Sequence, residues 1–319
     1  MNNDKWAALL FVLIFGVANL LAVGSGDVVK RSFTVNKGGM LVVDSDLGSV
    51  QVSSWSNKKV EVAIEIEMSD EIRRHFKLDF QQDGDMVEIT GVMEKKLSWF
   101  SGRKQVTYKI KVPDEFNIKV KTSGGSVSVG GVKGEVETVT SGGSLHFNDI
   151  SGPVLGQTSG GSIDLLKISG DANIRTSGGS IRMEDVEGDV EAKTSGGSLA
   201  IANVKGMVTA HTSGGSIKID DVRGGLDVST SGGGITARLP YQPAKDCKMK
   251  TSGGSIHVQM APDVTVLLDA RTSGSSVKSD FEIAVKGEIK RGKLKGKING
   301  GGPLVYLRTS GGGIYLEKL

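Results

Sequence analysis

The sequence predicts an all-β fold, a parallel β-solenoid with rungs of about 18–21 residues, capped by an N-terminal β-rich region. The tetrapeptide Thr-Ser-Gly-Gly recurs at one constant spacing, beginning at Thr122, Thr140, Thr158, Thr176, Thr194, Thr212 and Thr230. It returns at Thr251, as Thr-Ser-Gly-Ser at Thr272, and at Thr309. Apolar residues between the copies alternate with polar ones. Units this short cannot bury a core alone, so they must stack.

The repeat at residues 176–193 shows the strand pattern. Its apolar positions are Ile181, Met183, Val186, Val190 and Ala192. The first two and the last two are alternating pairs with the strand period of two, and no helical stripe of i, i+3, i+4, i+7 is present. Each repeat therefore predicts two strands with one buried face. We expect Ile181, Ile201 and Ile217 to point inward, and Arg182, Ala200 and Lys218 to point outward.

Glycines separate the two strands of each repeat. In Ser177-Gly178-Gly179 we expect a tight reversal with positive φ, and a second corner at Gly188. The Thr that opens each motif continues the inward parity of the preceding strand. Its methyl group should lie inside or at the rim, with the hydroxyl bonded locally.

Two other solenoid classes do not fit the repeat. Left-handed hexapeptide acyltransferases need an aliphatic residue every six positions, but Glu187 and Lys193 follow Ile181 at those steps. Calcium-binding nonapeptide repeats place Asp after the glycines, where this chain has Ser.

Residues 1–24 predict a signal peptide or an N-terminal membrane anchor. The chain carries no charge from Trp6 to Gly26, an apolar stretch close to the length that spans a bilayer. The small residues Ala22 and Gly24 would suit a cleavage site. Either alternative predicts export to the periplasm, the cell surface or the medium, with a membrane tether through residues 6–26 in the second.

Residues 25–121 predict the N-terminal β-rich cap, which would cover the edge of the first rung. Residues 47–52 have the Gly-Ser-Val cadence of the repeats, which indicates continuity with the solenoid. Asp83-Gly84 predicts a hairpin turn, and residues 69–76 predict one short helix.

Residues 122–319 predict the solenoid domain itself. After Thr230 the motif returns only at Thr251 and Thr272, so these rungs are longer, and the last interval, to Thr309, is the longest. The excess, at residues 278–303, predicts a strand pair inserted before a closing rung at residues 304–319.

Three stretches carry a family resemblance: FTVNKGGMLVVDSDLGSVQVSSW, VTYKIKVPDEFNIKVKTSGGSVSV and INGGGPLVYLRTSGGGIYLEKL. With the Thr-Ser-Gly-Gly rungs between them, the chain resembles the bacterial domain-of-unknown-function family described as putative adhesins. The resemblance implies a β-solenoid on or outside the cell envelope. It implies no catalytic residues.

Catalytic, cofactor and metal sites are not predicted. The serines belong to turns, His146 and His257 occupy outward strand positions, and the single cysteine, Cys247, takes the place of a buried valine. The tenth repeat position holds Gly131, Asp149, Lys167, Asp185, Asn203 and Asp221. Like carboxylates there would lie two rungs, about 10 Å, apart, too far to share a cation. We expect this column to balance charge between rungs.

The sequence therefore favours a non-catalytic envelope module of adhesive or structural type. The alternative is a polysaccharide-acting parallel β-helix enzyme. Such enzymes usually carry long loops over one face, whereas the rungs from Thr122 to Thr230 keep one constant length without insertion.

One segment concentrates positive charge in a chain whose net charge is only +3. We expect it to dock an anionic envelope partner: a glycan, a lipid headgroup or a surface protein, but not nucleic acid. Its cations are Lys286, Lys290, Arg291, Lys293, Lys295 and Lys297. The alternative is that lysines on a peripheral strand discourage edge-to-edge aggregation.

Overall fold

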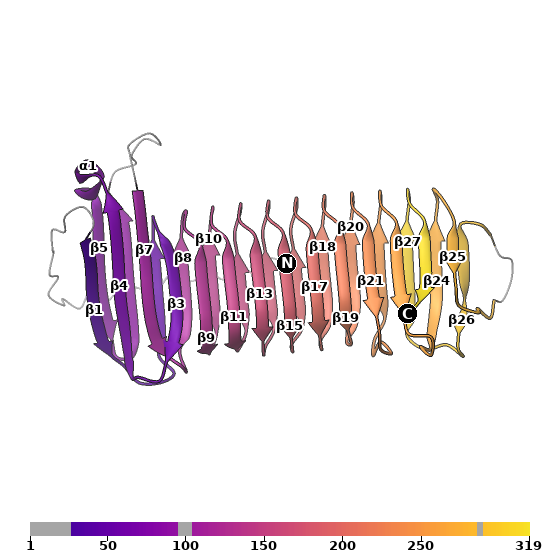
Figure 1. Cartoon of the computed structure of the whole chain (residues 1–319), viewed down its shortest axis with the longest axis horizontal. Helices are drawn as coiled ribbons and strands as arrows, with labels where there is room; N and C mark the ends of the chain where they lie inside the picture. Colours follow the sequence, from indigo (N-terminus) through magenta and orange to yellow (C-terminus); the bar gives the residue numbers. More distant parts are fainter. Residues whose placement is uncertain (1–26, 95–103, 286–289) are drawn as a thin grey trace, which may run out of the picture.

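Two long β-sheets lie face to face and form a rod (Figure 1). The computed structural model describes residues 27–94, 104–285 and 290–319. Sheet A has the strand order β1-β4-β7-β3-β9-β11-β13-β15-β17-β19-β21-β23-β28-β25. Sheet B has the order β26-β24-β27-β22-β20-β18-β16-β14-β12-β10-β8-β2-β6-β5. With 14 strands each, the sheets extend over about 60 Å at the usual strand spacing. The predicted parallel β-solenoid is confirmed.

Each regular rung contributes one strand to each sheet. The sheet A strands are β9 (Val127–Lys133), β11 (Leu145–Ser151), β13 (Ile163–Ile168), β15 (Ile181–Val186), β17 (Leu199–Val204), β19 (Ile217–Val222), β21 (Ile235–Leu239) and β23 (Ile256–Met260). The sheet B strands are β8 (Asn117–Thr122), β10 (Val136–Thr140), β12 (Val154–Gln157), β14 (Ala172–Arg175), β16 (Val190–Lys193), β18 (Met207–Thr212), β20 (Gly225–Thr230) and β22 (Cys247–Thr251). Neighbouring rungs pair in parallel, so equivalent repeat positions stand side by side.

The core lies between the two sheets and consists of stacked aliphatic columns. Ile181 pairs with Leu199, which pairs with Ile217. The side chains predicted to point inward are at most 2% exposed, and the predicted outward positions are solvent-accessible: Ile181, Ile201 and Ile217 inside, Arg182, Ala200 and Lys218 outside. Period-two alternation therefore located the core correctly.

The threonine of each turn links its rung to the preceding one. Thr158 is 2% exposed, and its Oγ1 donates a hydrogen bond to the carbonyl oxygen of Gly143, 2.8 Å away in the previous rung. The hydroxyl oxygen of Thr158 in turn accepts a hydrogen bond from the amide of Gly161 at 3.3 Å. The pattern recurs in the following rungs, for example at Thr176 and Thr194. The expected burial and local bonding are confirmed, with an inter-rung bond in addition.

The expectation that the turn glycines need positive φ is wrong. No glycine of a Thr-Ser-Gly-Gly turn in residues 104–285 or 290–319 has φ in the left-handed range. Glycine is required in these turns for a steric reason. A Cβ on Gly197 would lie 2.0 Å from the carbonyl oxygen of Gly179 in the rung below. At Gly196 the nearest atom, the carbonyl oxygen of Gly178, would be 3.3 Å away. Close stacking of backbones excludes a side chain at the second glycine.

The N-terminal region continues both sheets. β2 (Met40–Ser45) pairs with β8, and β3 (Ser49–Trp55) pairs with β9, which confirms the continuity expected from residues 47–52. Beyond them, β7 (Lys104–Pro113), β4 (Lys59–Met68) and β1 (Asp27–Thr34) extend sheet A, while β6 (Met86–Met93) and β5 (Phe76–Asp83) extend sheet B.

Local features of this region follow the sequence. Gly84, with φ of +54°, turns the β5–β6 hairpin, and the short helix is α1 (Asp70–Arg73). The rings of Phe33 and Phe80, on the two outermost strands, stack at 6.4 Å between centroids. Antiparallel strands and this aromatic contact thus close the end of the core.

The opposite end departs from chain order. The strands are β24 (Val266–Thr272), β25 (Val277–Ser279), β26 (Lys293–Ile298), β27 (Leu304–Thr309) and β28 (Ile314–Lys318). β27 inserts between β22 and β24, and β28 between β23 and β25. The rung expected to close the solenoid therefore lies one rung inside it, where each of its strands gains a partner on both sides. β26 runs antiparallel to β24 at the edge of sheet B.

Among the residues in these three ranges, no helix is long and apolar enough to cross a membrane. Residues 1–26, which carry the predicted signal or anchor, lie outside the described part of the chain.

Ile201→Lys should lower the free energy of unfolding by about 3 kcal/mol or more, because it buries an unpaired ammonium between the sheets. Lys218→Ile, on the outer face, should change it by less than about 0.5 kcal/mol. Denaturant unfolding of the two variants measures both effects. The reverse ranking would show that the faces are assigned wrongly.

Gly197→Ala should lower the free energy of unfolding by about 2–3 kcal/mol, because its methyl group meets the backbone of the rung below. Gly196→Ala, which has more room, should cost less than about 1 kcal/mol. Thermal unfolding of the pair provides the comparison, and equal losses would contradict the steric account.

Candidate functional site

The lysines of β26 lie on one face of the strand, as the alternation in KLKGKI predicts. Lys293, Lys295 and Lys297 are exposed, whereas Leu294 is partly buried and Ile298 is buried. Lys290 and Arg291 precede the strand and are also exposed, and Lys286 lies outside the described residues. The structure therefore places three of the six predicted cations together on one outward face.

Other strands add cations that sequence reasoning missed. In sheet B, Lys293 pairs with Arg271 of β24, Arg271 with Arg308 of β27, and Arg308 with Lys250 of β22. Lys248 is also on β22, two residues before Lys250. These cations come from separate parts of the chain, so only the inserted position of β27 reveals the cluster. We call Lys248, Lys250, Arg271, Lys293, Lys295, Lys297 and Arg308 the C-terminal basic surface.

Asp269 pairs with three of these cations, and it is 9% exposed. Arg308 Nη2 lies 2.9 Å from Asp269 Oδ1, Arg271 Nε lies 3.4 Å from the same atom, and Lys295 Nζ lies 3.8 Å from Oδ2. Arg308 also donates to the backbone carbonyl of Asp269 and stacks 3.8 Å over the ring of Tyr306. Arg308 is thus mainly a structural group.

The remaining lysines of the surface lack an acidic partner. Within the described ranges, no carboxylate lies within 4.0 Å of the side-chain nitrogen of Lys248, Lys250, Lys293 or Lys297. Elsewhere on the rod, charges on adjacent rungs form opposite pairs, such as Lys119 with Glu137 and Arg238 with Asp220. Like charges on adjacent strands are destabilising. The accumulation here is therefore an exception to the pattern of the rod.

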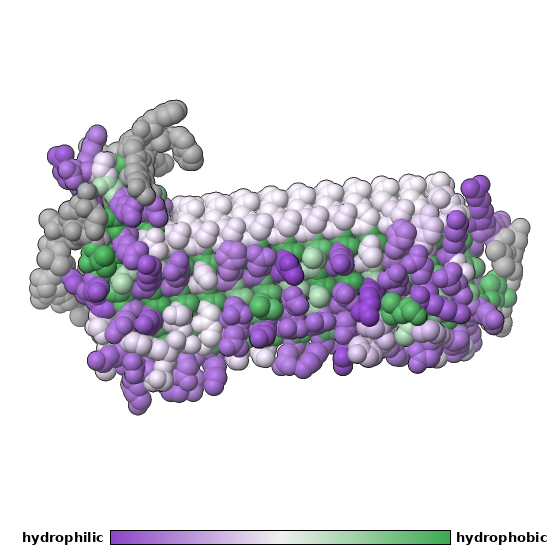
Figure 2. All heavy atoms as spheres, in the orientation of Figure 1, coloured by the Kyte–Doolittle hydropathy of each residue, from purple (hydrophilic) through white to green (hydrophobic). Residues whose placement is uncertain are grey.

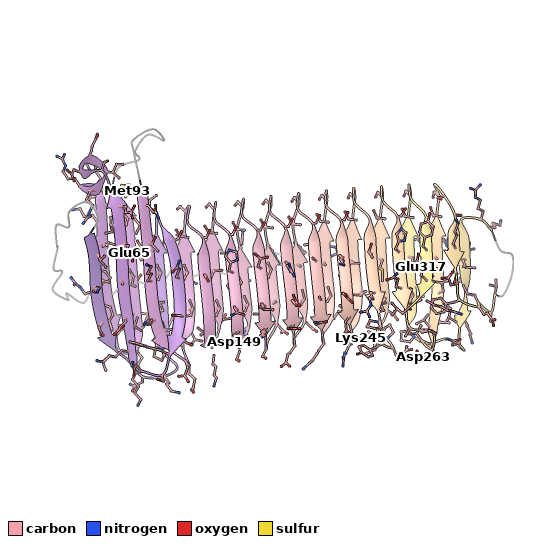
Figure 3. All side chains as sticks on the ribbon, in the orientation of Figure 1. Glu65, Met93, Asp149, Lys245, Asp263 and Glu317 are labelled. Atoms are coloured by element: carbon pink, nitrogen blue, oxygen red, sulfur yellow. The ribbon has the colours of Figure 1, made fainter. Side chains whose placement is uncertain are left out.

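A second candidate is an open groove of about 520 Å³ on the corner edge of the rod. Figure 3 shows Asp149, Lys245 and Asp263 along this edge. The groove is lined by the tenth-position column and its neighbours: Asp149, Lys167, Ile168, Ser169, Asp185, Val186, Glu187, Asn203, Val204, Lys205, Asp221 and Arg223. It is the place where an enzyme of the alternative class would have its carboxylates.

Backbone conformation explains the tenth-position column better than charge balancing does. Asp149, Lys167, Asp185, Asn203 and Asp221 all have φ between 50° and 59°, and Gly131 has 72°. Asp, Asn and Gly tolerate this left-handed conformation, which is why they dominate the column. Asn203 also donates to Asp185 at 3.0 Å. The expected charge balancing between rungs is therefore less important than the need for a residue that accepts positive φ at this corner.

Side chains in the groove are already engaged with one another. Lys205 pairs with Glu187, and Ser169 donates to the same carboxylate at 3.1 Å. These two hydrogen bonds, with that from Lys205 the larger effect, lower the pKa of Glu187. A general acid at neutral pH needs the opposite shift.

The cysteine and the histidines of the solenoid have structural roles. Cys247 is 1% exposed, and burial raises its pKa to about 12, in agreement with its predicted role as a buried apolar substitute. His211 Nδ1 lies 2.7 Å from Ser229 Oγ, His146 pairs with Asp164 at 3.2 Å, and His257 stacks on Tyr315. Among the described residues, no group of three or more His, Cys, Asp or Glu could hold a metal ion.

Comparison with known proteins settles the family. The family model described as Toastrack DUF4097 matches residues 39–317. The chain belongs to the Toastrack DUF4097 family. This confirms the resemblance to a domain-of-unknown-function family that the rungs and their flanking stretches indicated. A search of the curated proteins found no match.

Solved structures similar to this Toastrack chain are remote in sequence. A “putative adhesin” from Bacteroides fragilis has 12% identity and a TM-score of 0.40, with 92% of this chain and 98% of that chain covered. A “putative adhesin” from Parabacteroides merdae has 15% identity and a TM-score of 0.44, covering 74% and 97%. A “putative lipid binding protein” from Parabacteroides distasonis has 15% identity and a TM-score of 0.43, covering 74% and 95%.

The left-handed column of this Toastrack chain yields a stability test. Lys167→Asn should raise the free energy of unfolding by about 0.5–1 kcal/mol, because Asn accepts positive φ more readily than Lys. Lys167→Val should lower it by about 1–3 kcal/mol. Denaturant titration measures both, and a loss on Lys167→Asn equal to that on Lys167→Val would contradict the conformational account.

Proposed function

We propose that the protein is a non-catalytic module of the cell envelope that binds an anionic partner through its C-terminal basic surface. The observation that carries the proposal is the accumulation of cations on four adjacent strands of sheet B. Four lysines in it have no carboxylate of the described chain within ion-pair distance, so their charge is available to a partner. The partner is an envelope glycan, a lipid headgroup or a surface protein.

Export and a membrane tether complete the proposal. Residues 6–26 supply the uncharged apolar stretch that an export signal or a retained anchor needs. A basic surface facing the periplasm or the exterior would meet the carboxylate and phosphate groups of envelope polymers and lipids.

A binding role is better supported than a catalytic one. The turn threonines are committed to backbone hydrogen bonds, the histidines contact neighbouring strands, and the carboxylate of Glu187 is held in its charged form. The groove is open to solvent, and no long loop covers the regular rungs beside it within residues 104–285. These features support a surface that binds without transforming its ligand.

Protection against aggregation is the competing explanation for the β26 lysines. Part of the outer edge of β26 is already paired, since the amide and carbonyl of Lys297 bond to Ala284 at 3.1 Å and 2.9 Å. The amide of Lys293 bonds to the carbonyl of Lys290 at 2.9 Å. Edge protection also gives no reason for Lys248 and Lys250, which lie on an interior strand of sheet B.

The proposal predicts salt-sensitive binding that depends on β26. The full chain should bind phosphatidylglycerol vesicles or polygalacturonate at low salt and lose several-fold in affinity at physiological salt, because ions screen exposed charges. Lys293→Gln, Lys295→Gln and Lys297→Gln together should weaken binding about five- to tenfold.

The matched control removes the same charge far from this surface, through Lys58→Gln, Lys59→Gln and Lys133→Gln. It should bind nearly as wild type does. Equal binding by wild type and the β26 variant, or increased self-association of that variant as its sole change, would leave the aggregation explanation.

A further inference from the structure

A single row of sheet B side chains runs the length of the regular solenoid without an acid. It consists of the residue immediately before the threonine of each turn, together with Lys293, which pairs with Arg271 from the antiparallel strand β26. In spatial order its members are Lys121, Val139, Gln157, Arg175, Lys193, His211, Ser229, Lys250, Arg308, Arg271 and Lys293. We call these residues the basic row. Seven of its eleven members are Lys or Arg, and all eleven are at least partly exposed.

The rows beside it differ in charge. Two residues further from the threonine turns on each strand, about 7 Å away, the neighbouring row includes Glu137, Glu191, Asp227 and Asp269 as well as three lysines. On the other side lie the buried threonines and then the Ser-Gly turns. Figure 2 shows these turns as a smooth strip of near-neutral hydropathy along one edge of the rod. The basic row is thus a narrow line without acids that follows the rod axis, beside a row of mixed charge.

We propose that the basic row is a lengthwise binding track for a linear acidic polysaccharide that carries carboxylates along its chain. The inference rests on the proposed function, because it names the partner class and extends the C-terminal basic surface along the rod. Ten strand spacings separate Lys121 from Lys293, so the track is about 48 Å long. Cations on adjacent strands stand about one sugar ring apart, and two gaps of three strand spacings, about 14 Å each, separate Lys121 from Arg175 and Lys193 from Lys250.

The narrowness of the row favours a polymer chain over a bilayer. A planar anionic membrane laid against sheet B would meet Glu137, Glu191 and Asp227 together with the row, and these carboxylates would repel it. A single extended chain can follow the row and leave the acids at its side. The charge pattern therefore favours an extended ligand over a planar one, in addition to favouring negative charge.

The edge beside the row suits a glycan. Each turn presents an exposed serine next to the track, such as Ser195 and Ser213. Their hydroxyls can donate to and accept from sugar hydroxyls, and the turns carry no bulky side chain that would hold a polymer away. A polyphosphate would use the cations but would gain less from this hydroxyl edge.

Five of the seven cations of the row have an acidic partner, and three acids are shared among these five cations. Arg271 and Arg308 both pair with Asp269, at 3.4 Å and 2.9 Å. Glu191 lies between Arg175 and Lys193, 3.2 Å from the former, and its pKa is lowered first by the hydrogen bond from Lys193. One acid thus neutralises only one of two cations. Lys121 pairs at 3.2 Å with Asp44 of β2, just beyond the end of the row. Lys250 has no acid partner within the described residues.

The test compares three variants of the full chain for binding to galacturonate oligomers of increasing length. The track variant carries Lys121→Gln, Arg175→Gln and Lys193→Gln, all outside the C-terminal basic surface. The control removes the same charge from sheet A, through Arg182→Gln, Lys218→Gln and Lys278→Gln. The third variant is the β26 triple substitution described above. Unfolding curves verify that each is folded.

For wild type, affinity should rise with oligomer length until the chain spans the track, because added sugars engage further cations at high effective concentration. The track variant should lose at least tenfold in affinity for long oligomers and most of the length dependence. The control should lose less than threefold. Binding to phosphatidylglycerol vesicles should be the same in the track variant and the control.

Three outcomes would overturn the inference. If track variant and control bind long oligomers equally while the β26 variant does not bind, the track is wrong and the proposed function stands. If the track variant loses vesicle binding as much as oligomer binding, the partner is a planar surface. If wild type binds neither oligomers nor vesicles at low salt, both the inference and the proposed function fail.

Discussion

The regular rungs of this rod depend on the parallel, in-register stacking of one rung on the next. Because equivalent residues stand one strand spacing apart, a property needed at one repeat position is needed in every rung. The second glycine of the turns shows the constraint most directly, since its Cα passes so close to the backbone below that no Cβ fits. The turn threonine adds a hydrogen bond across the same interface. The repeated Thr-Ser-Gly-Gly motif is thus explained by contacts between rungs. The backbone conformation of the turn itself explains little of it.

The same stacking converts sequence columns into surface rows. Within the core it gives continuous aliphatic ladders, and at the corner it gives a line of residues with left-handed backbone. On the outer faces it brings like charges together unless the repeats alternate in sign. Most outer columns of this chain are mixed in sign, and the column before the turn threonine has no acid from Lys121 to Lys293.

The sequence was sufficient to predict the solenoid and its buried positions, because both follow from period and parity. The continuity of the N-terminal region was predicted from the likeness of residues 47–52 to the repeats. Prediction from the sequence failed for the turn dihedral angles and for the strand order at the C-terminal end, which depend on how the rungs stack in three dimensions. Positive φ was predicted for Gly178 and Gly179, yet it occurs at Asp185. The composition of a corner does not determine which of its residues adopts the left-handed conformation. The basic segment at β26 was visible as a local run, whereas Lys250 and Arg271 joined it only through strand order.

The displaced rung at residues 304–319 affects how the rod can fold. A regular solenoid can grow in chain order, each rung adding to the one before it. Here residues 266–279 precede residues 304–319 in the chain, yet their native neighbours are β27 and β28. Direct stacking of Thr272 beside Thr251 would offer a competing register that must be undone. The end of the rod that carries the basic surface is therefore the part that cannot be assembled vectorially, and its completion is set by the arrival of a later segment.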